Sequence, residues 1–289
     1  MRLGVIILPE QRWAAARALW QRAEQLGFDH AWTYDHLAWR TLRDGPWFGA
    51  VPTLTAAACA TSRIRLGTMV ATPNFRHPVG FAKELITLDD VSEGRLTVGL
   101  GAGGRGWDAT VFGEEPLPLP ARANRFTEFV ADLDVLLREP ETSFSGEFYT
   151  AVEARTYPGC VQQPRVPFVV AAYGPRAMRV AARYGQAWVT TNGTGTPGAE
   201  SFLPDAREQL ARLREICADE GRNPAKLDAY VVFGTGPERP YDSPEALADL
   251  MGRYEEAGFT DLVLHWPRAT EPHRGDLAAF EAAVTHVVG

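Results

Sequence analysis

"IRLGTMVATPNFRHPVGFAKELITLDDVSEGRLTVGLG", residues 64–101, contains two strand-like runs with one helical run between them. The first run, 64–72, and the last, 95–103, are rich in small and β-branched residues, which favour strands. Between them, residues 78–92 place apolar side chains at steps of three and four, as in a helix with one buried face, and Gly94 follows its end. A strand, a helix and a strand in this order predict a βαβ unit with parallel strands.

The same alternation extends over the whole chain. Further strands are predicted at 2–9, 29–36, 167–173, 186–191, 227–234 and 260–266. Further helices are predicted at 13–26, 50–61, 125–139, 175–184, 204–220, 243–258 and 276–288. Eight strand-and-helix units in 289 residues favour an α/β fold of the closed (β/α)8 (TIM) barrel type over a doubly wound sheet, in a single domain covering 1–289. Residues 140–167 are aromatic rather than Ser/Gly-rich, so we expect an ordered hairpin or excursion between units four and five.

Composition narrows the class of partner and compartment. The net charge of -7 and the lack of a basic stripe argue against nucleic acid or an anionic membrane as a partner. No apolar run reaches 18 residues, so neither a transmembrane helix nor a signal peptide is expected. Three distant cysteines without a CxxC motif indicate buried thiols in a reducing compartment, and we predict a cytoplasmic protein.

In a (β/α)8 barrel the active site lies at the carboxyl ends of the strands. These ends are rich in glycine, hydroxyl and aromatic residues, and show no His, Asp or Glu spacing typical of a metal site. The run "GLGAGG", 99–104, is weak as a dinucleotide fingerprint because it follows the fourth strand. We expect a flat ring or a neighbouring backbone to approach Gly101 and Gly103, or the glycines simply to relieve crowding at the rim.

A phosphate site is predicted after the fifth strand. A small-residue turn precedes a helix that begins near Pro175, where free N–H groups and the helix dipole favour an anion. The predicted contributors are Ala172, Tyr173, Gly174, Pro175, Arg176 and, from the next strand end, Thr191. The alternative is a capped helix beside a polar surface loop.

A histidine and several aromatic residues complete the expected site. His36 ends the second strand beside Asp35, where an imidazole can exchange a proton with a substrate; the alternative is a structural histidine. The predicted pocket wall, suited to a flat ligand, consists of Trp39, Trp47, Phe75 and Trp266. The alternative for these rings is that they cover the end of the barrel.

The segments "GFDHAWTYDH", "RLGTMVATPNFRHPVGFAKELITLDDVSEGRLTVGLGAG" and "VPFVVAAYGPRAMRVAARYGQAWVTT" resemble the bacterial luciferase-like superfamily, in particular its members that use coenzyme F420, a deazaflavin. The resemblance is good over residues 1–193 and consists of an ordered series of motifs at successive strand ends. It implies a (β/α)8 barrel, in agreement with the eight units, and a homodimer.

The resemblance also implies roles for individual residues. Asp35 and His36 match a pair that lies against the cofactor, with the histidine catalytic. A non-proline cis peptide is implied at Met69–Val70, in support of the ring, and Thr72 matches a ring contact. The turn at Ala172–Gly174 matches the loop near the cofactor's phosphate tail.

Two positions depart from the family pattern. Sugar-phosphate dehydrogenases of the family carry a glutamate that serves as an acid where this chain has Gly104, and Asp108 lies too far along the chain to be assumed equivalent. Tyr173 replaces a residue that is commonly glycine, which would reshape the tail site.

The predicted activity is hydride transfer between C5 of the deazaflavin and a small organic substrate (an enone, imine or alcohol), with His36 exchanging the proton. The first alternative is an FMN-dependent monooxygenase that needs a separate flavin reductase. The second is a flavin-binding barrel without catalytic activity.

Overall fold

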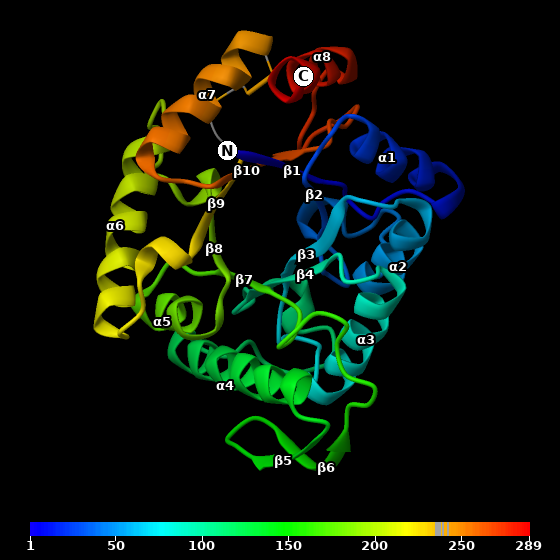
Figure 1. Cartoon of the computed structure of the whole chain (residues 1–289), viewed down its shortest axis with the longest axis vertical. Helices are drawn as coiled ribbons and strands as arrows, with labels where there is room; N and C mark the ends of the chain where they lie inside the picture. The colour runs from blue at the N-terminus through cyan, green and yellow to red at the C-terminus, as the bar shows by residue number, and fades with distance from the viewer. Residues whose placement is uncertain (235–237, 239, 242) are drawn as a thin grey trace.

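The fold is a closed barrel of eight parallel strands surrounded by helices (Figure 1), in a computed structural model that describes residues 1–234, 238, 240, 241 and 243–289. The barrel strands are β1 (Arg2–Ile6), β2 (His30–Thr33), β3 (Arg65–Ala71), β4 (Leu96–Gly101), β7 (Phe168–Ala171), β8 (Ala187–Thr191), β9 (Asp228–Val232) and β10 (Asp261–His265). Their order around the barrel, β1-β10-β9-β8-β7-β4-β3-β2, confirms the predicted (β/α)8 architecture.

In the described part of the chain, eight α-helices cover the outside of the barrel. They are α1 (Trp13–Gln25), α2 (Ala50–Ala60), α3 (Pro78–Val91), α4 (Leu119–Arg138), α5 (Pro175–Tyr184), α6 (Leu203–Asp219), α7 (Pro244–Ala257) and α8 (Leu277–Val288). Ser243 caps α7 by accepting a hydrogen bond from the N–H of Ala246, with Pro244 at the first helical position. The predicted start of α4 at residue 125 was wrong, because its first turn, from Leu119, is largely exposed and lacks the apolar period.

The predicted excursion between units four and five is an antiparallel hairpin, β5 (Glu141–Ser145) and β6 (Thr150–Arg155), next to α4. The carboxylate of Glu128 on α4 accepts hydrogen bonds from the backbone N–H groups of Phe148 and Tyr149, each at 2.8 Å. These bonds tie the turn of the hairpin to α4, so the segment is an ordered part of the fold.

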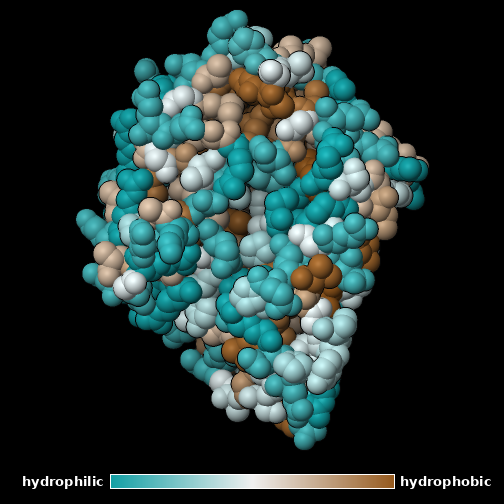
Figure 2. All heavy atoms as spheres, viewed as in Figure 1, coloured by the Kyte–Doolittle hydropathy of each residue, from teal (hydrophilic) through white to brown (hydrophobic). Residues whose placement is uncertain are grey.

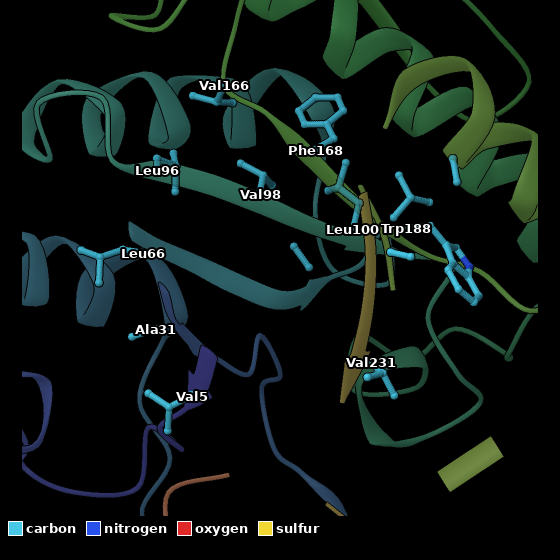
Figure 3. Packing of buried hydrophobic residues seen from close by; sticks show 14 of the residues in the cluster. Val5, Ala31, Leu66, Leu96, Val98, Leu100, Val166, Phe168, Trp188 and Val231 are labelled. Carbon is cyan, nitrogen blue, oxygen red and sulfur yellow. The ribbon is translucent and has the colours of Figure 1, made fainter. Parts of the chain in front are cut away.

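Side chains alternate between two core layers because successive residues of a strand point to opposite faces. Figure 3 shows the outer layer, between strands and helices, with Val5, Ala31 and Leu66 among its labelled residues. The inner layer fills the barrel and includes Ile6, Trp32, Met69, Val169, Tyr230 and Val263. Residues that continue the alternation of this inner set past the end of a strand can point into the opening at the carboxyl end of the barrel.

The face seen in Figure 2 is mostly hydrophilic, with hydrophobic atoms gathered between α7 and α8. Among the described residues, no helix is long and apolar enough to cross a membrane. Cys160 and Cys217 are buried as expected, whereas Cys59 is exposed on α2, which corrects the expectation that all three thiols are buried.

Candidate active site

A histidine–aspartate pair lies at the carboxyl end of the barrel. Nδ1 of His36, just after β2, is 2.5 Å from Oδ2 of Asp108 in the short helix η2 (Trp107–Ala109) that follows β4. The other oxygen, Oδ1 of Asp108, accepts a hydrogen bond from the N–H of Leu37 at 2.9 Å. Because a carboxylate accepts, the hydrogen lies on Nδ1 of His36, and Nε2 is the ring atom left to exchange a proton with a bound molecule.

Asp35 does not serve His36. Its buried carboxylate accepts two hydrogen bonds from Arg76, from Nε at 2.6 Å and from Nη2 at 2.8 Å. Adjacent residues of an extended segment point in opposite directions, so Asp35 turns away from the imidazole of His36. In this structure Asp35 holds the 72–78 turn against β2 through Arg76, and its predicted catalytic role stays a prediction.

The Met69–Val70 peptide is cis, as the resemblance implied, and the pairing of β3 with β4 shifts register between Thr68 and Ala71. A Cβ added to Gly101 would lie 2.6 Å from Cγ2 of Val70. The neighbour at Gly101 is thus a side chain of β3 rather than its backbone, which agrees with the alternative that the glycine relieves crowding at the rim.

Two further predicted residues lie near this bulge. Gly103 has a φ of +73°, in the left-handed region that favours glycine. Thr72 is buried, and its hydroxyl accepts a hydrogen bond from the N–H of Asn74 at 3.4 Å. Cofactor contacts by Met69, Val70, Thr72, Gly101 and Gly103 stay predictions.

Two further histidines lie at this end of the barrel: His265, which ends β10, and His273, which sequence reasoning did not select. The rings of His265 and His273 are stacked with centroids 3.7 Å apart. Nδ1 of His265 is 2.8 Å from the carbonyl of Phe233, and Nε2 is 2.7 Å from the hydroxyl of Tyr34. Burial lowers the pKa of His265 to about 3, so the ring is neutral, donates through Nδ1 and accepts from Tyr34.

The two ring nitrogens of His273 differ in their hydrogen bonding. Its Nδ1 is 2.9 Å from the carbonyl of Gly234, so this nitrogen carries the hydrogen. Its Nε2 is buried and has no hydrogen-bond partner among the residues that the structure describes. His273 also borders a cavity of about 370 Å³ that Asn192 and Phe233 help to line.

Two of the four residues predicted to form an aromatic wall lie next to each other. The ring of Trp39 stacks on Trp47 at a centroid distance of 6.2 Å and on His273 at 6.0 Å. Nε1 of Trp47 donates to the backbone carbonyl of His36 at 2.8 Å, so the wall also positions the histidine. Phe75 is half-buried, with the guanidinium of Arg76 over its ring, and its place in a substrate pocket stays a prediction.

Trp266 lines a cavity of about 250 Å³ outside the barrel interior, and its place in a substrate pocket stays a prediction. It packs in the outer layer against Phe280 of α8, with ring centroids 5.5 Å apart, whereas His265 points inward. The alternation along β10 could have separated His265 from Trp266, because Asp261, Val263 and His265 fall on one face of the strand.

The structure agrees only in part with the phosphate site predicted at 172–176. Gly174 precedes α5 without a side-chain cap, and residues 173–176 are exposed, so the N–H groups of this helix start are accessible. Ala172, in contrast, points into the outer layer, and its carbonyl accepts a hydrogen bond from Nε1 of Trp188 at 2.7 Å. The side chain of Ala172 is thus unavailable to a ligand. Thr191 accepts from the N–H of Gly193 at 3.4 Å.

Sequence reasoning missed two arginines on the first turns of α4. Nη1 of Arg122 donates to the carbonyl of Gly103 at 2.9 Å, and Nη2 of Arg125 donates to Oδ1 of Asn74 at 2.6 Å. The Nε atom of each is buried and has no partner within the described ranges. Nη1 of Arg176 contacts Oδ1 of Asn124 on the same helix at 3.4 Å. The hydrogen-bond partners of these cations are neutral, so the cluster suits an anion. The spacing of Arg122 and Arg125 was visible, but α4 was expected to begin too late to include Arg122.

Comparison with known proteins adds an independent observation. A sequence profile of the luciferase-like monooxygenase family matches residues 1–236. An F420-dependent glucose-6-phosphate dehydrogenase of Beutenbergia cavernae is 32% identical over 301 aligned positions, and the match covers 86% of each chain. A protein with the same description from Amycolatopsis mediterranei is 35% identical over 207 positions, 70% of this chain and 60% of the other.

Solved structures share the fold. An F420-dependent secondary alcohol dehydrogenase in complex with an F420-acetone adduct superposes with a TM-score of 0.81 at 20% identity, covering 100% of this chain and 98% of the other. The monooxygenase RslO1 from Streptomyces bottropensis gives a TM-score of 0.75 at 23% identity, covering 100% and 97%. At these identities the likeness establishes the barrel and its connections alone.

Proposed function

The chain belongs to the luciferase-like monooxygenase family, and from this premise we propose that it is a coenzyme F420-dependent oxidoreductase. The observation that carries the proposal is the extended sequence similarity to F420-dependent glucose-6-phosphate dehydrogenases. A proton-exchanging imidazole at the carboxyl end of β2 supports it, because hydride transfer to or from an alcohol, enone or imine also moves a proton.

The residues present fit a flat cofactor with an anionic tail. The buried, unpartnered Nε atoms of Arg122 and Arg125 are orphaned donors that a phosphate oxygen would satisfy. Arg176 and the uncapped start of α5 add positive potential on the same side. We assign the tail to these groups and the ring to the segment around Met69, Val70 and Thr72.

When bound, the deazaflavin supplies a carbon, C5, that accepts or releases a hydride. The protein's part is to position the substrate and handle the proton. Nε2 of His36 exchanges the proton with the substrate oxygen or nitrogen, while Trp47 holds the backbone of His36 through its carbonyl. Trp39 and the buried face of His273 exclude water from one side of the reacting groups.

The glycine at position 104 argues against oxidation of glucose 6-phosphate by the mechanism that the resemblance implies for the relatives. A Cβ added there would meet only the N of Gly106, at 3.8 Å, so a larger residue would fit but none is present. The resemblance places an acidic glutamate at this position in sugar-phosphate dehydrogenases. We therefore propose a small hydroxyl, enone or imine substrate that needs a single proton-exchanging residue.

The proposal is tested by titrating the purified chain with F420 and, separately, with FMN, and following fluorescence. We expect F420 to bind and to be reduced or oxidised by a compound in a panel of alcohols, enones and imines. His36→Ala is expected to lower kcat by about 10²- to 10⁴-fold. His286→Ala, at an exposed position of α8, is the matched control and is expected to retain full activity.

Tight FMN binding with oxygen-dependent turnover would replace the proposal by the monooxygenase alternative, with a flavin reductase as partner. Binding without turnover of any panel member would favour a non-catalytic barrel. Assembly as a homodimer and a cytoplasmic location stay predictions; gel filtration coupled to light scattering tests the first.

A further inference from the structure

The proposed reaction does not explain why the carboxylate of Asp108 lies at the carboxyl end of the barrel. Asp108 lies 72 residues from His36 in the chain, and its side chain is 6% exposed. Its two oxygens divide their contacts: Oδ2 faces Nδ1 of His36 at 2.5 Å, and Oδ1 faces the N–H groups of Leu37 at 2.9 Å and Ala38 at 3.5 Å. One side chain thus contacts both the imidazole and the backbone that follows it.

We propose that Asp108 is a positioning residue that fixes His36 in the tautomer with hydrogen on Nδ1. The inference rests on the proposed function only for its effect on turnover, since the tautomer is a property of the chain itself. A carboxylate only accepts hydrogen bonds, so it selects the Nδ1–H form and leaves a lone pair on Nε2. It also stabilises the imidazolium that forms when Nε2 takes a proton.

The direction of proton transfer follows from this arrangement. In the oxidation of a hydroxyl compound, Nε2 of His36 would accept the O–H proton. The substrate would lose a hydride from carbon and become a carbonyl, and a bound deazaflavin would supply the two-electron acceptor. The proton then leaves His36 for solvent, which can reach the side chain because it is 29% exposed. In the reverse reaction, Nε2 returns the proton to the carbonyl oxygen.

The local geometry also offers a way to separate positioning from a purely structural role. In Asp108→Asn the remaining oxygen can still accept from the N–H of Leu37, so the tie between the two loops is retained. The amide nitrogen would face Nδ1 of His36 and can only donate, which favours hydrogen on Nε2 instead. A structural role predicts little change in this variant, whereas a positioning role predicts the wrong tautomer.

The experiment combines ¹⁵N chemical shifts of the histidine rings in the full-length chain with steady-state kinetics. The signals of His36 are assigned from their absence in His36→Gln, and spectra are recorded at alkaline pH, where neutral imidazoles dominate. We expect the wild type to carry hydrogen on Nδ1 and Asp108→Asn to carry it on Nε2. With F420 and a substrate, kcat should fall by about 10²- to 10⁴-fold while the Kd for F420 stays within about twofold.

Two variants complete the design. Asp108→Glu keeps an acceptor and is expected to restore the Nδ1–H tautomer and part of kcat. Asp44→Asn, at an exposed carboxylate of the loop after β2, is the matched control and should change neither readout. If Asp108→Asn retains hydrogen on Nδ1 and turns over within about twofold of wild type, the proposal is wrong. If the wild type shows no F420 chemistry, the proposed function fails, and the tautomer measurement alone decides the role of Asp108.

Discussion

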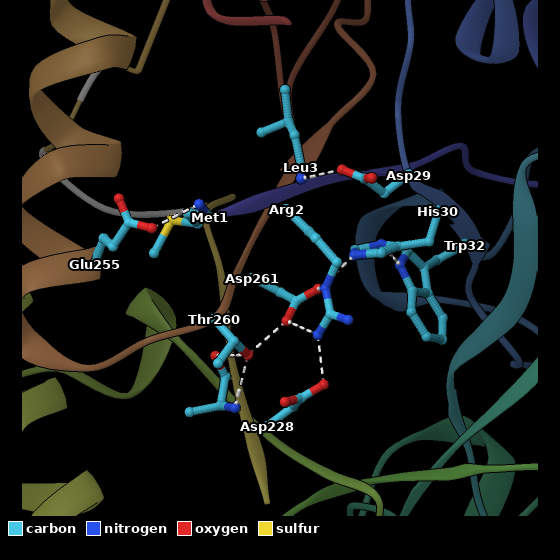
Figure 4. A network of polar contacts seen from close by, with 11 residues as sticks. Met1, Arg2, Leu3, Asp29, His30, Trp32, Asp228, Glu255, Thr260 and Asp261 are labelled. Atoms are coloured by element: carbon cyan, nitrogen blue, oxygen red, sulfur yellow. Dashed lines mark hydrogen bonds and ion pairs between the residues drawn. The ribbon is translucent and has the colours of Figure 1, made fainter. Parts of the chain in front are cut away.

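The two ends of the barrel differ in the hydrogen-bond network that joins β2 and β10. At the amino-terminal end the network is charged. Four residues further along both strands, at the carboxyl end, it is neutral. Figure 4 shows the first: Asp261 accepts from Nε and Nη2 of Arg2 at 2.8 and 2.7 Å and contacts Nε2 of His30 at 2.9 Å. Nδ1 of His30 accepts from Nε1 of Trp32 at 2.6 Å, so its Nε2–H donates to Asp261.

At the other end the corresponding residues are Tyr34 on the β2 side and His265 on β10. Their hydroxyl–imidazole hydrogen bond contains no charge, and Nε2 of the stacked His273 has no partner in the described part of the chain. The network at the amino end is closed, with a donor for each oxygen of Asp261, whereas the carboxyl end retains capacity for a ligand. We therefore expect the amino end to contribute mainly to stability, and under the proposed function the carboxyl end to bind the ligand.

A glycine makes room for a histidine at both ends. A Cβ on Gly4 would lie 2.1 Å from the ring of His30, which must cross β1 to reach Asp261 on β10. A Cβ on Gly234 would lie 2.5 Å from the ring of His265. The absent side chains are therefore part of both networks.

The largest expected effect comes from breaking the amino-terminal network. Asp261→Asn leaves Arg2 facing an amide, and we expect a loss of about 3 to 5 kcal/mol in the free energy of unfolding, measured in urea at pH 7. Asp249→Asn, which breaks an exposed pair with Arg253, should cost less than about 0.5 kcal/mol. A loss below about 1 kcal/mol for Asp261→Asn would show that the network contributes little.

The same variant has a pH signature. Burial raises the pKa of Asp261, but hydrogen bonds from His30 and Arg2 outweigh burial and hold it below its usual value of 3.8. The stability contributed is therefore present above about pH 4 and is lost as the pH falls through the folded-state pKa. Asp261→Asn should lack this part of the acid sensitivity.

Gly4→Ala is expected to cost about 3 kcal/mol, since the added methyl group overlaps the ring of His30 and must displace it from Asp261. The control is Gly80→Ala on α3, where an added Cβ meets nothing within 4 Å and stability should change by less than about 1 kcal/mol. Thermal unfolding of both variants measures the difference. Equal melting temperatures would contradict the need for a glycine at position 4.

At the carboxyl end, the neutral state of His265 predicts a loss of stability in acid. Its pKa is about 3 in the folded chain against 6.5 in the unfolded chain, so the unfolded state takes up the proton first. This contribution is fully present above about pH 6.5 and falls by about 1.4 kcal/mol per pH unit below it. His265→Gln should remove about 2 kcal/mol of the stability difference between pH 6.5 and 5, and parallel pH profiles for the two proteins would refute the neutral assignment.

The smallest effect is expected for Tyr34→Phe. It removes the O–H donor from the buried Nε2 of His265, and we expect a loss of about 1 to 2 kcal/mol in urea unfolding. Tyr157→Phe, at an exposed ring, is the control and should be neutral. A neutral Tyr34→Phe would mean that water replaces the hydroxyl, and that this end is wetter than the packing indicates.

Sequence reasoning succeeded where a property depends on neighbours along the chain. The βαβ pattern of 64–101 identified the barrel, and the position of Gly94 after α3, with a positive φ, follows from local backbone chemistry. It did not anticipate that Trp266 packs against α8 or that Asp35 pairs with Arg76, because both were selected by residue type without regard to the alternation of their strands. The error at α4 had the opposite origin, because an exposed first turn carries no apolar period.

The sequence alone determined the repeating units, the barrel and the strand ends that form the candidate site. Only the tertiary structure decided that His36 pairs with Asp108 rather than with Asp35, and that Arg122 and Arg125 lie beside Gly103 and Asn74. Periodicity reports which face of an element is buried, and it does so through residues a few positions apart. Which side chains meet across the end of a barrel depends on strand order, register and loop conformation, all of which are set when the barrel closes.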